Sequence, residues 1–552
     1  MLLIRLIDET DGYGDMEWIP DIFLPFGYVA IGQDMRGTEK SEGNFSLFMS
    51  DSEDAIDLGD WIVAQEWSNG QIYTFGASAD GIGSLQVPVH NPNWLMAQYI
   101  AWCPANLYNI LLPGGAYKQK LTEDWIYGLS MPNPEVADEN IQTIHEGENG
   151  RGEFWPSVNV GPEIWKNVHA RNAFWAGWYD VFEVEMLHAF EGYNTFSDET
   201  VRGTSVLTID PVGHCLEGAE YFPQNAVDGR TAVILGQLFD IYGIHPVTRS
   251  HAIKNITFYV MSSNDDAGLA VGQYWTSVES FPAPKMTEYY FHADGSATKD
   301  IDSDPNAEGA DSTTYKYDPS DPVPTLGGNN LPPSIGGSIE CGPWDQTPAD
   351  ARDDVLKFQT RVFDEPLYLT GPMTSTLFVS SDAIDTDFTV KISDVYPTGE
   401  VRILQDSAVR MRWRDHTVDP TYMEADQVYE VEISLWNTSY IVAPGHALRI
   451  SVSSSNYPRF SVNPNNGILL ADPMYPGENV TAVNTLYHSP KYPSRVSLPV
   501  VEKSQLPMVH VLKEMQKAYP ELLTDGNLEK YNTYLERDLR NHLTSKRRPA
   551  TH

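Results

Sequence analysis

The spacing of apolar positions gives the first part of the chain an alternating character. Residues 2–7 (LLIRLI) and 28–37 (YVAIGQDMRG) are apolar runs of strand length. Between residues 52 and 67, apolar side chains recur at the spacing of an amphipathic helix. Strands that alternate with helices favour a mostly parallel sheet with helices on its faces. We therefore predict an α/β domain, which begins with residues 1–105.

A segment of different composition interrupts this alternation. Residues 106–170 are rich in Pro, Gly, Asn and Trp and contain only short helical patterns, so we predict an inserted cap. Apolar strand runs return at residues 170–180 (ARNAFWAGWYD) and 204–214 (TSVLTIDPVGH), and each ends in a polar loop. Residues 171–249 are therefore predicted to complete the α/β domain.

The pattern changes again after about residue 250. Residues 295–350 are rich in Asp, Pro, Gly and Ser, which is typical of a long surface excursion. Short strands separated by turns follow, and this spacing predicts an antiparallel β-sandwich over residues 250–502. The clearest strand runs are 375–381, 387–396, 427–436 and 446–455. Residues 503–552 are predicted to form a helical extension with amphipathic helices at 508–523 and 527–543.

The charge balance excludes some classes of partner. The 552 residues include 76 Asp and Glu against 36 Lys and Arg, for a formal net charge of −40. Nucleic acids and anionic membranes require a basic surface, so we expect neither as a partner. Acidic chains are typical of salty or extracellular habitats, and the four sequons at Asn44, Asn255, Asn437 and Asn479 point the same way. These features favour an extracellular location over a cytoplasmic one without fixing the compartment.

Cofactor motifs are missing from the sequence. The three cysteines, Cys103, Cys215 and Cys341, are too widely spaced for a disulfide framework or a zinc site. There is no H-E-x-x-H motif and no phosphate-binding loop of the P-loop type. We expect no metal and no organic cofactor. The sequence leaves the oligomeric state open.

The stretch FGASADG at residues 75–81 carries the first chemical signal. A short strand run ends on Gly76, and the residues after Gly81 can start a helix. A serine between a strand and a helix, flanked by glycines, is the setting of a nucleophile elbow. The second glycine comes one position later than in the usual G-x-S-x-G pattern, so the motif alone does not distinguish Ser78 from a structural serine.

Two further residues complete a possible serine hydrolase triad. Asp180 and His214 each close an apolar strand run, and the order Ser78, Asp180, His214 is that of α/β-hydrolases. Each residue also has a structural alternative. Asp180 could cap the helix that follows it, and His188 is a rival base, although its surroundings predict the interior of a helix. Cys215 could suggest thiol chemistry, but it lacks an elbow of its own, and we expect it to pack.

Several longer stretches resemble one family. The segment GYVAIGQDMRGTEKSEGNF (27–45) is similar to a sequence block of the CocE/NonD hydrolases, which include cocaine esterase-type enzymes, α-amino-acid ester hydrolases and X-prolyl dipeptidyl peptidases. The elbow of that family also has its second glycine late. AGWYD (176–180) resembles the segment that carries its acid, and DPVGH (210–214) loosely resembles the one that carries its base. The resemblance extends through YKYDPSDPVPTLGG (315–328) to SVSSSNYPRF (451–460).

The resemblance implies an α/β-hydrolase domain, a helical cap and a C-terminal jelly roll. It assigns the nucleophile to Ser78, the acid to Asp180 and the base to His214. It also implies an apolar acyl pocket, for which Phe182, Trp125 and Trp155 are the candidates.

The oxyanion hole is where the sequence departs from the family. The backbone N–H of Ala79 is expected to be one donor. The family's second donor is a tyrosine after the first long strand, where this chain has Ile7 and Asp8 and reaches no tyrosine before Tyr13. The second donor is therefore either Tyr13 or missing.

Together these features predict a serine hydrolase that cleaves carboxylic esters, or amides, of small molecules through an acyl-enzyme. One alternative is an X-prolyl dipeptidyl peptidase, which would need an anionic group to hold the amino terminus of its substrate. The other is a catalytically inert protein whose jelly roll binds carbohydrate.

Overall fold

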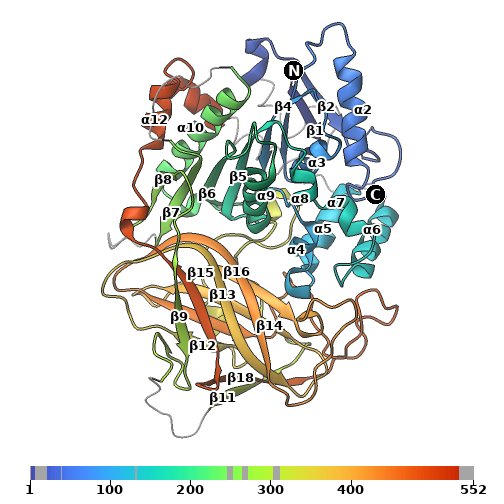
Figure 1. Cartoon of the computed structure of the whole chain (residues 1–552). Helices are drawn as coiled ribbons and strands as arrows, with labels where there is room; N and C mark the ends of the chain where they lie inside the picture. The colour runs from blue at the N-terminus through green and yellow to red at the C-terminus, as the bar shows by residue number, and fades with distance from the viewer. Residues whose placement is uncertain are drawn as a thin grey trace, which may run out of the picture.

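A computed structural model describes residues 2–6, 22–38, 40–130, 133–244, 253–263, 271–302 and 311–533 of the chain. An α/β domain forms one half of the molecule and a β-sandwich forms the other, with the cap helices beside the junction (Figure 1). This arrangement confirms the predicted fold class of an α/β-hydrolase with a cap and a jelly roll. The predicted residue boundaries between these domains stay predictions.

The α/β domain is built on a parallel sheet with the strand order β2-β1-β3-β4-β5-β6-β7. Strand β8 pairs antiparallel with β7. The central strand β5 is buried along nearly its whole length, as expected for a parallel strand covered on both faces. The strands are β1 (Leu2–Leu6), β2 (Ala30–Asp34), β3 (Ile72–Ala77), β4 (Leu95–Ala101), β5 (Arg171–Tyr179), β6 (Val206–Gly213), β7 (Ile256–Ser262) and β8 (Tyr274–Val278).

Helices α2 (Asp51–Val63), α3 (Ala79–Gln86), α9 (Glu183–Phe196) and α10 (Gln224–Ile241) accompany this sheet. The strands and the helix predicted from the first 105 residues are confirmed. The helix after the elbow starts earlier than its apolar pattern indicated, at Ala79, and the later part of that pattern belongs to strand β4.

The cap consists of short helices: α4 (Leu107–Leu111), α5 (Gln119–Leu129), α6 (Pro134–Glu146), α7 (Phe154–Val158) and α8 (Pro162–Trp165). Glu148, just after α6, joins the cap to the jelly roll. One of its carboxylate oxygens accepts hydrogen bonds from Arg412 Nη2 (2.6 Å) and Nε (2.9 Å) and from the indole N–H of Trp413 (2.8 Å). Its other oxygen accepts from the backbone N–H of Leu470 at 2.6 Å. Because all four bonds are buried, this carboxylate fixes the cap against the sandwich.

The jelly roll contains two antiparallel layers. One has the strand order β10-β9-β20-β13-β16, with β18 also paired to β13 and to β11 and β19, and the other has the order β12-β17-β14-β15. The strands are β9 (Lys285–Phe291), β10 (Ala297–Thr298), β11 (Ser312–Tyr317), β12 (Leu356–Gln359), β13 (Leu367–Ser381), β14 (Asp387–Val395), β15 (Val401–Arg410), β16 (Tyr429–Val442), β17 (Ala447–Ser453), β18 (Ala482–Ser489), β19 (Tyr492–Pro493) and β20 (Arg495–Val500). All four strand runs predicted after residue 370 are confirmed.

One strand belongs to both halves of the molecule. Strand β7 closes the parallel sheet beside β6 and also pairs, in parallel, with β16 of the jelly roll through Tyr440 and Ile441. The result is a single hydrogen-bonded sheet of 16 strands among the described residues, which runs from the α/β domain into the sandwich. The two halves are therefore joined by backbone hydrogen bonds as well as by side-chain packing.

The expected surface excursion at 295–350 is only partly on the surface. It supplies strands β10 and β11, and its residues Val323, Asn329 and Asn330 are buried. Its polar composition was misleading because buried amides here hydrogen-bond to backbone carbonyls of neighbouring segments. The first predicted C-terminal helix corresponds to α12 (Val511–Ala518), which packs against α10 through Tyr519 and Phe239. Residues 525–533 are helical, and the rest of the second predicted helix lies outside the described residues.

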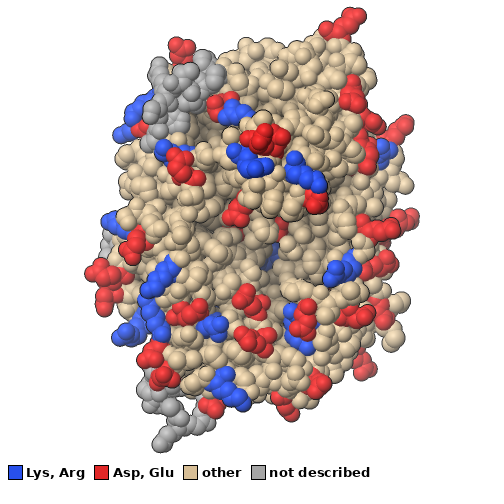
Figure 2. Space-filling view, in the orientation of Figure 1, with Lys and Arg blue, Asp and Glu red and all other residues tan. Residues whose placement is uncertain are grey.

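The surface reflects the charge of the sequence. Carboxylate side chains are spread over the visible face, with cations interspersed among them (Figure 2). Within the described ranges, no helix has the length and apolar character needed to span a membrane.

Candidate active site

Ser78 lies at a sharp turn between strand β3 and helix α3. Its backbone has φ 57° and ψ −127°, a conformation that residues with a side chain rarely adopt. The flanking glycines make the turn possible. A Cβ on Gly76 would lie 2.4 Å from the backbone oxygen of Asp80, and one on Gly81 would lie 2.7 Å from Cys103 Cβ. The late second glycine is thus required by the packing of α3 against the end of β4.

Asp180 follows strand β5 and is fully buried. Its Oδ1 accepts a hydrogen bond from the backbone N–H of Phe182 at 2.7 Å. Its Oδ2 lies 2.6 Å from Nδ1 of His214. Helix α9 begins three residues later, at Glu183, and its N-cap is Phe182. Asp180 therefore lies within hydrogen-bonding distance of the imidazole and is not the N-cap residue of α9.

His214 connects the other two residues. It directly follows β6, is also buried, and its Nε2 lies 2.9 Å from Ser78 Oγ. Burial by itself lowers the pKa of His214, but the neighbouring Cys215 and Asp180 outweigh burial and raise the pKa to about 10. A raised pKa makes the imidazole a stronger base, while a smaller fraction of it is neutral at pH 7. The geometry of Ser78, His214 and Asp180 is that of a nucleophile, its base and the group that orients the base.

The backbone N–H of Ala79 belongs to the first turn of α3, where N–H groups have no partner within the helix. The helix dipole is positive at this end and favours negative charge beside it. The N–H of Ala79 thus lies at the positive end of α3, directly after Ser78. Tyr13 and Asp8, the residues in question for the second donor, lie outside the described residues.

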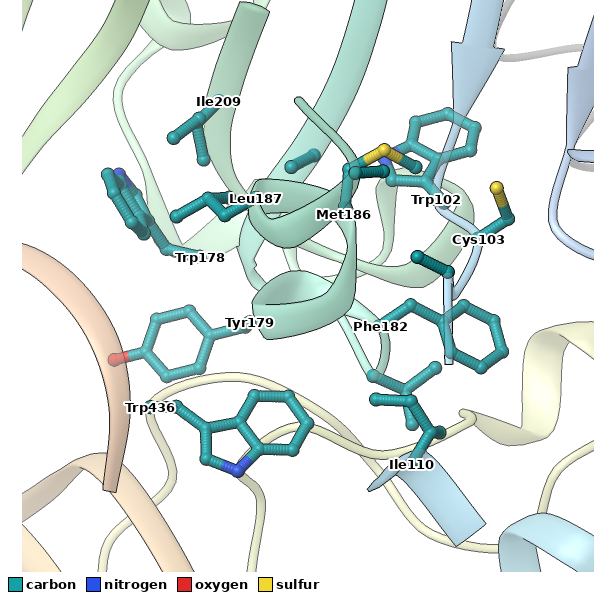
Figure 3. Packing of buried hydrophobic residues seen from close by; sticks show 14 of the residues in the cluster. Trp102, Cys103, Ile110, Trp178, Tyr179, Phe182, Met186, Leu187, Ile209 and Trp436 are labelled. Carbon is teal, nitrogen blue, oxygen red and sulfur yellow. The ribbon is translucent and has the colours of Figure 1, made fainter. Parts of the chain in front are cut away.

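An aromatic wall lies next to the imidazole. The ring of Phe182 contacts that of His214 edge-on, with centroids 5.2 Å apart, and Trp125 of α5 lies 6.0 Å from Phe182. Figure 3 shows Tyr179 and Phe182, on either side of Asp180, packed into the apolar core. Trp155 is placed differently from the other two acyl-pocket candidates. It is buried within the cap, where its indole N–H donates to Gly147 O and its ring packs on Tyr108.

The rival residues are also placed by the structure. His188 lies on α9, as predicted, with an exposed side chain whose Nδ1 is 3.4 Å from Glu185 Oε1. Cys215 has a left-handed backbone (φ 52°) and borders His214 as part of the turn after β6. It contributes to the electrostatics of the imidazole and is not positioned on an elbow.

Sequence reasoning missed the residues that support the loop of Asp180 from the jelly-roll side. Asn329 donates its amide hydrogens to the backbone oxygens of Asp180 (3.0 Å) and Trp178 (3.3 Å). Gln405 of β15 donates to Trp178 O at 3.0 Å. Neither residue lies near Asp180 in sequence. Only the YKYDPSDPVPTLGG resemblance, which ends at residue 328, pointed to that part of the chain.

Comparison with family models gives two matches. Residues 6–215 match the X-Pro dipeptidyl-peptidase (S15 family) model, and residues 251–497 match the X-Pro dipeptidyl-peptidase C-terminal non-catalytic domain. The second match coincides with the part of the chain that forms most of the sandwich.

Similar proteins cover nearly the whole chain. Cocaine esterase of Rhodococcus sp. (strain MB1 Bresler) is 30% identical over 548 residues, which span 87% of this chain and 89% of that protein. Among solved structures, an α-amino acid ester hydrolase matches with a TM-score of 0.74 and 20% identity over 91% of this chain and 92% of its own. A CocE/NonD family hydrolase from Staphylococcus aureus matches with a TM-score of 0.63 and 17% identity, over 91% and 88% of the two chains.

Proposed function

Because this chain belongs to the CocE/NonD family of serine hydrolases, we propose that it cleaves carboxylic esters of small molecules through an acyl-enzyme on Ser78. The observation that carries the proposal is the hydrogen-bonded series Ser78 Oγ–His214 Nε2 (2.9 Å) and His214 Nδ1–Asp180 Oδ2 (2.6 Å). Three strands far apart in sequence converge on this arrangement.

The proposed reaction has two halves. In the first, Ser78 Oγ attacks the ester carbonyl carbon while its proton passes to His214 Nε2, and the carbonyl oxygen becomes an oxyanion. The tetrahedral intermediate collapses, the bond to the leaving oxygen breaks, and His214 returns the proton to the departing alcohol. In the second, water attacks the acyl-enzyme with His214 again as base. The acid is released and Ser78 regains its proton.

Asp180 has a supporting role in both halves. Its carboxylate accepts a hydrogen bond from Nδ1–H, which keeps Nε2 free to accept the proton of Ser78. It also stabilises the imidazolium that forms in each half. The N–H of Ala79 is the proposed donor to the oxyanion, where one such donor contributes about 10²–10³-fold in rate.

The surroundings support an ester of a neutral acyl group. Phe182 and Trp125 offer aromatic surface beside the imidazole, so the acyl chain is expected to be apolar. The X-prolyl dipeptidyl peptidase activity would require a carboxylate that is free to hold an amine. The most buried carboxylate of the cap loop, Glu148, already bonds Arg412, Trp413 and Leu470. We therefore favour esters over peptides. The assembled side chains also weigh against an inert carbohydrate-binding role.

The test is covalent labelling combined with a substrate panel. A fluorophosphonate probe should react with the wild-type protein at Ser78, and the protein should hydrolyse p-nitrophenyl esters faster than dipeptide amides. Ser78→Ala should abolish both labelling and turnover. Ser84→Ala is the matched control, because Ser84 is a buried serine of helix α3, which directly follows Ser78, and it should keep both. Labelling that persists in Ser78→Ala would refute the proposed nucleophile.

A further inference from the structure

A small hollow lies where the α/β domain, the cap and the jelly roll meet. Val181 lines it from the loop after β5, Lys118 and Lys120 from the start of α5, and Asn329 and Arg459 from the jelly-roll side. Its lining includes three cationic side chains and no carboxylate. In a chain with twice as many acidic as basic residues, this is an unusual local composition.

Lys118 is the most informative residue in this lining. Its side chain is only 1% exposed, and its Nζ makes no hydrogen bond within the described part of the chain. Its Nζ lies over the ring of Trp436, 4.3 Å from the ring centroid. Burial and the nearby Arg459 hold the pKa of Lys118 well below its ordinary value, although Asp406 and Asp180 oppose them. A buried amine without a hydrogen-bonding partner is costly and calls for an explanation, of which a bound ion is one.

Trp436 is placed over this amine by an irregularity in its strand. The register between β13 and β16 shifts between Pro372 and Thr374, opposite Trp436, and Trp436 has φ 64°. A bulge of this kind redirects a side chain and is maintained only when the surrounding structure supports it. Figure 3 shows the indole of Trp436 in the same part of the core as Tyr179, the residue that precedes Asp180 in the sequence.

Arg459 contributes the second cation. It is 2% exposed and pairs with Asp406 through Nη1, while its Nε and Nη2 have no partner among the described residues. The hollow thus has unpartnered donors on Lys118 Nζ and on two nitrogens of Arg459, against one unpartnered acceptor, Asn329 Oδ1. The amide hydrogens of Asn329 are already used by backbone carbonyls.

We propose that this hollow is a binding site for one small monovalent anion, held by Lys118 and Arg459. The excess of donors, the absence of a lining carboxylate and the positive end of the α5 dipole all favour negative charge. A halide or a single carboxylate group has the required charge and size. The exposed Ser338 and the half-buried Lys120 lie on the lining, so solution ions can reach the site from the seam between cap and jelly roll.

Because the loop of Asp180 borders the hollow, occupancy is coupled to the candidate active site. Val181 lines the hollow directly after Asp180, and Asn329 lines it while bonding the backbone oxygen of Asp180. A bound anion would favour the protonated form of Lys118. It would also fix the positions of the segments that carry Val181 and Asn329. We expect the anion to stabilise the fold and to order this loop.

The first test measures thermal stability with bromide and formate as probes. Each is titrated into the full-length protein at constant ionic strength. Gluconate, an anion too large for the hollow, makes up the remaining ionic strength at each point. We expect a saturable rise in Tm of about 2–5 °C at a hundredfold excess over Kd. The same rise should be lost in Lys118→Met. It should persist in the matched control Lys120→Met, whose side chain lies on the lining but pairs with Asp124.

A crystal soaked in bromide gives a second readout that needs no variant. Anomalous scattering should place one bromide within hydrogen-bonding distance of Lys118 Nζ. The proposal is overturned if that position is empty while Tm shows no saturable response, or if Lys118→Met responds as the wild type does. Neither measurement requires turnover, so a failure here is distinct from a failure of the proposed esterase function.

A kinetic arm, which rests on that proposed function, separates the two sources of the anion. Two p-nitrophenyl esters of equal chain length are compared, one ending in methyl and one in carboxylate. If the site holds a substrate carboxylate, Lys118→Met should raise KM about tenfold for the carboxylate ester alone, and bromide should compete with it. If the site holds a free ion, KM for both esters should be unchanged in Lys118→Met while the Tm response is lost.

Discussion

Replacing Asp180 with asparagine tests the proposed role of this residue with almost no change in shape. The structure dictates how the amide must turn. The backbone N–H of Phe182 donates to Oδ1 at 2.7 Å, so an asparagine here keeps its oxygen at that position. Its NH₂ group then faces His214 Nδ1, which must become an acceptor. The ring proton moves to Nε2, and Nε2 can no longer accept the proton of Ser78.

The size of the effect follows from these two bonds. Rotating the amide would restore the productive tautomer but would leave the buried N–H of Phe182 facing a second donor, at a cost of about 1–3 kcal/mol. The neutral amide also no longer stabilises the imidazolium. In another triad enzyme, the same replacement lowers kcat by about 10⁴-fold, equivalent to about 5 kcal/mol. We expect kcat of Asp180→Asn to fall by about 10³–10⁴-fold.

The assay is kcat on a p-nitrophenyl ester, together with the rate of fluorophosphonate labelling and the Tm. Both rates should fall while Tm stays within a few degrees of the wild type, because volume and hydrogen-bond number are preserved. Glu191→Gln, a carboxylate-to-amide change on the exposed surface of α9, is the control and should leave kcat within twofold. A fall of less than tenfold in Asp180→Asn would refute the tautomer argument.

Three further predictions concern the base, its rival and the cap. Because the pKa of His214 is raised to about 10, kcat/KM should increase with pH along a limb above the ordinary His range. Cys215→Ala should move that limb to lower pH, and a wild-type limb near pH 6.5 would contradict the prediction. His188→Ala should keep at least half of the wild-type kcat, whereas His214→Ala should lose about 10³-fold or more; the reverse result would show that the base is misassigned. Glu148→Ala should lower the free energy of unfolding by about 3–5 kcal/mol in a denaturant titration, because it leaves buried Arg412 with one carboxylate fewer. A loss below about 1 kcal/mol would argue that Glu148 does not fix the cap against the jelly roll.

The candidate triad could be predicted because its signals are local. Ser78, Asp180 and His214 each follow a buried strand, and the carboxyl ends of parallel strands meet at one edge of a sheet. Strand runs and turn residues within ten positions were enough to propose these three residues. Phe182 was accessible for the same reason, because it lies two residues after Asp180.

Features that depend on contacts between distant segments were not predictable. Trp155 was chosen as an acyl-pocket residue because it is a tryptophan of the cap, yet nothing in its neighbourhood tells which face of a short helix meets Tyr108. Asn329 lies in a segment whose composition indicates solvent, and its burial depends on carbonyls some 150 residues away in the chain. The pairing of β7 with β16 involves only two residue pairs, which leave no periodic signal.

That pairing has a consequence for how this protein can be divided. A domain that can be moved between proteins must have sheet edges whose backbone groups water can solvate. Removing the sandwich would expose the backbone of β7 that now pairs with β16. Expressing residues 1–262 alone, which removes β8 as well as the sandwich, should yield aggregates that associate through the exposed edge of β7. The same restriction applies in evolution, so we expect the catalytic and sandwich segments to be inherited together. Shuffling experiments should place their crossovers within loops of either half and not at the junction between the halves.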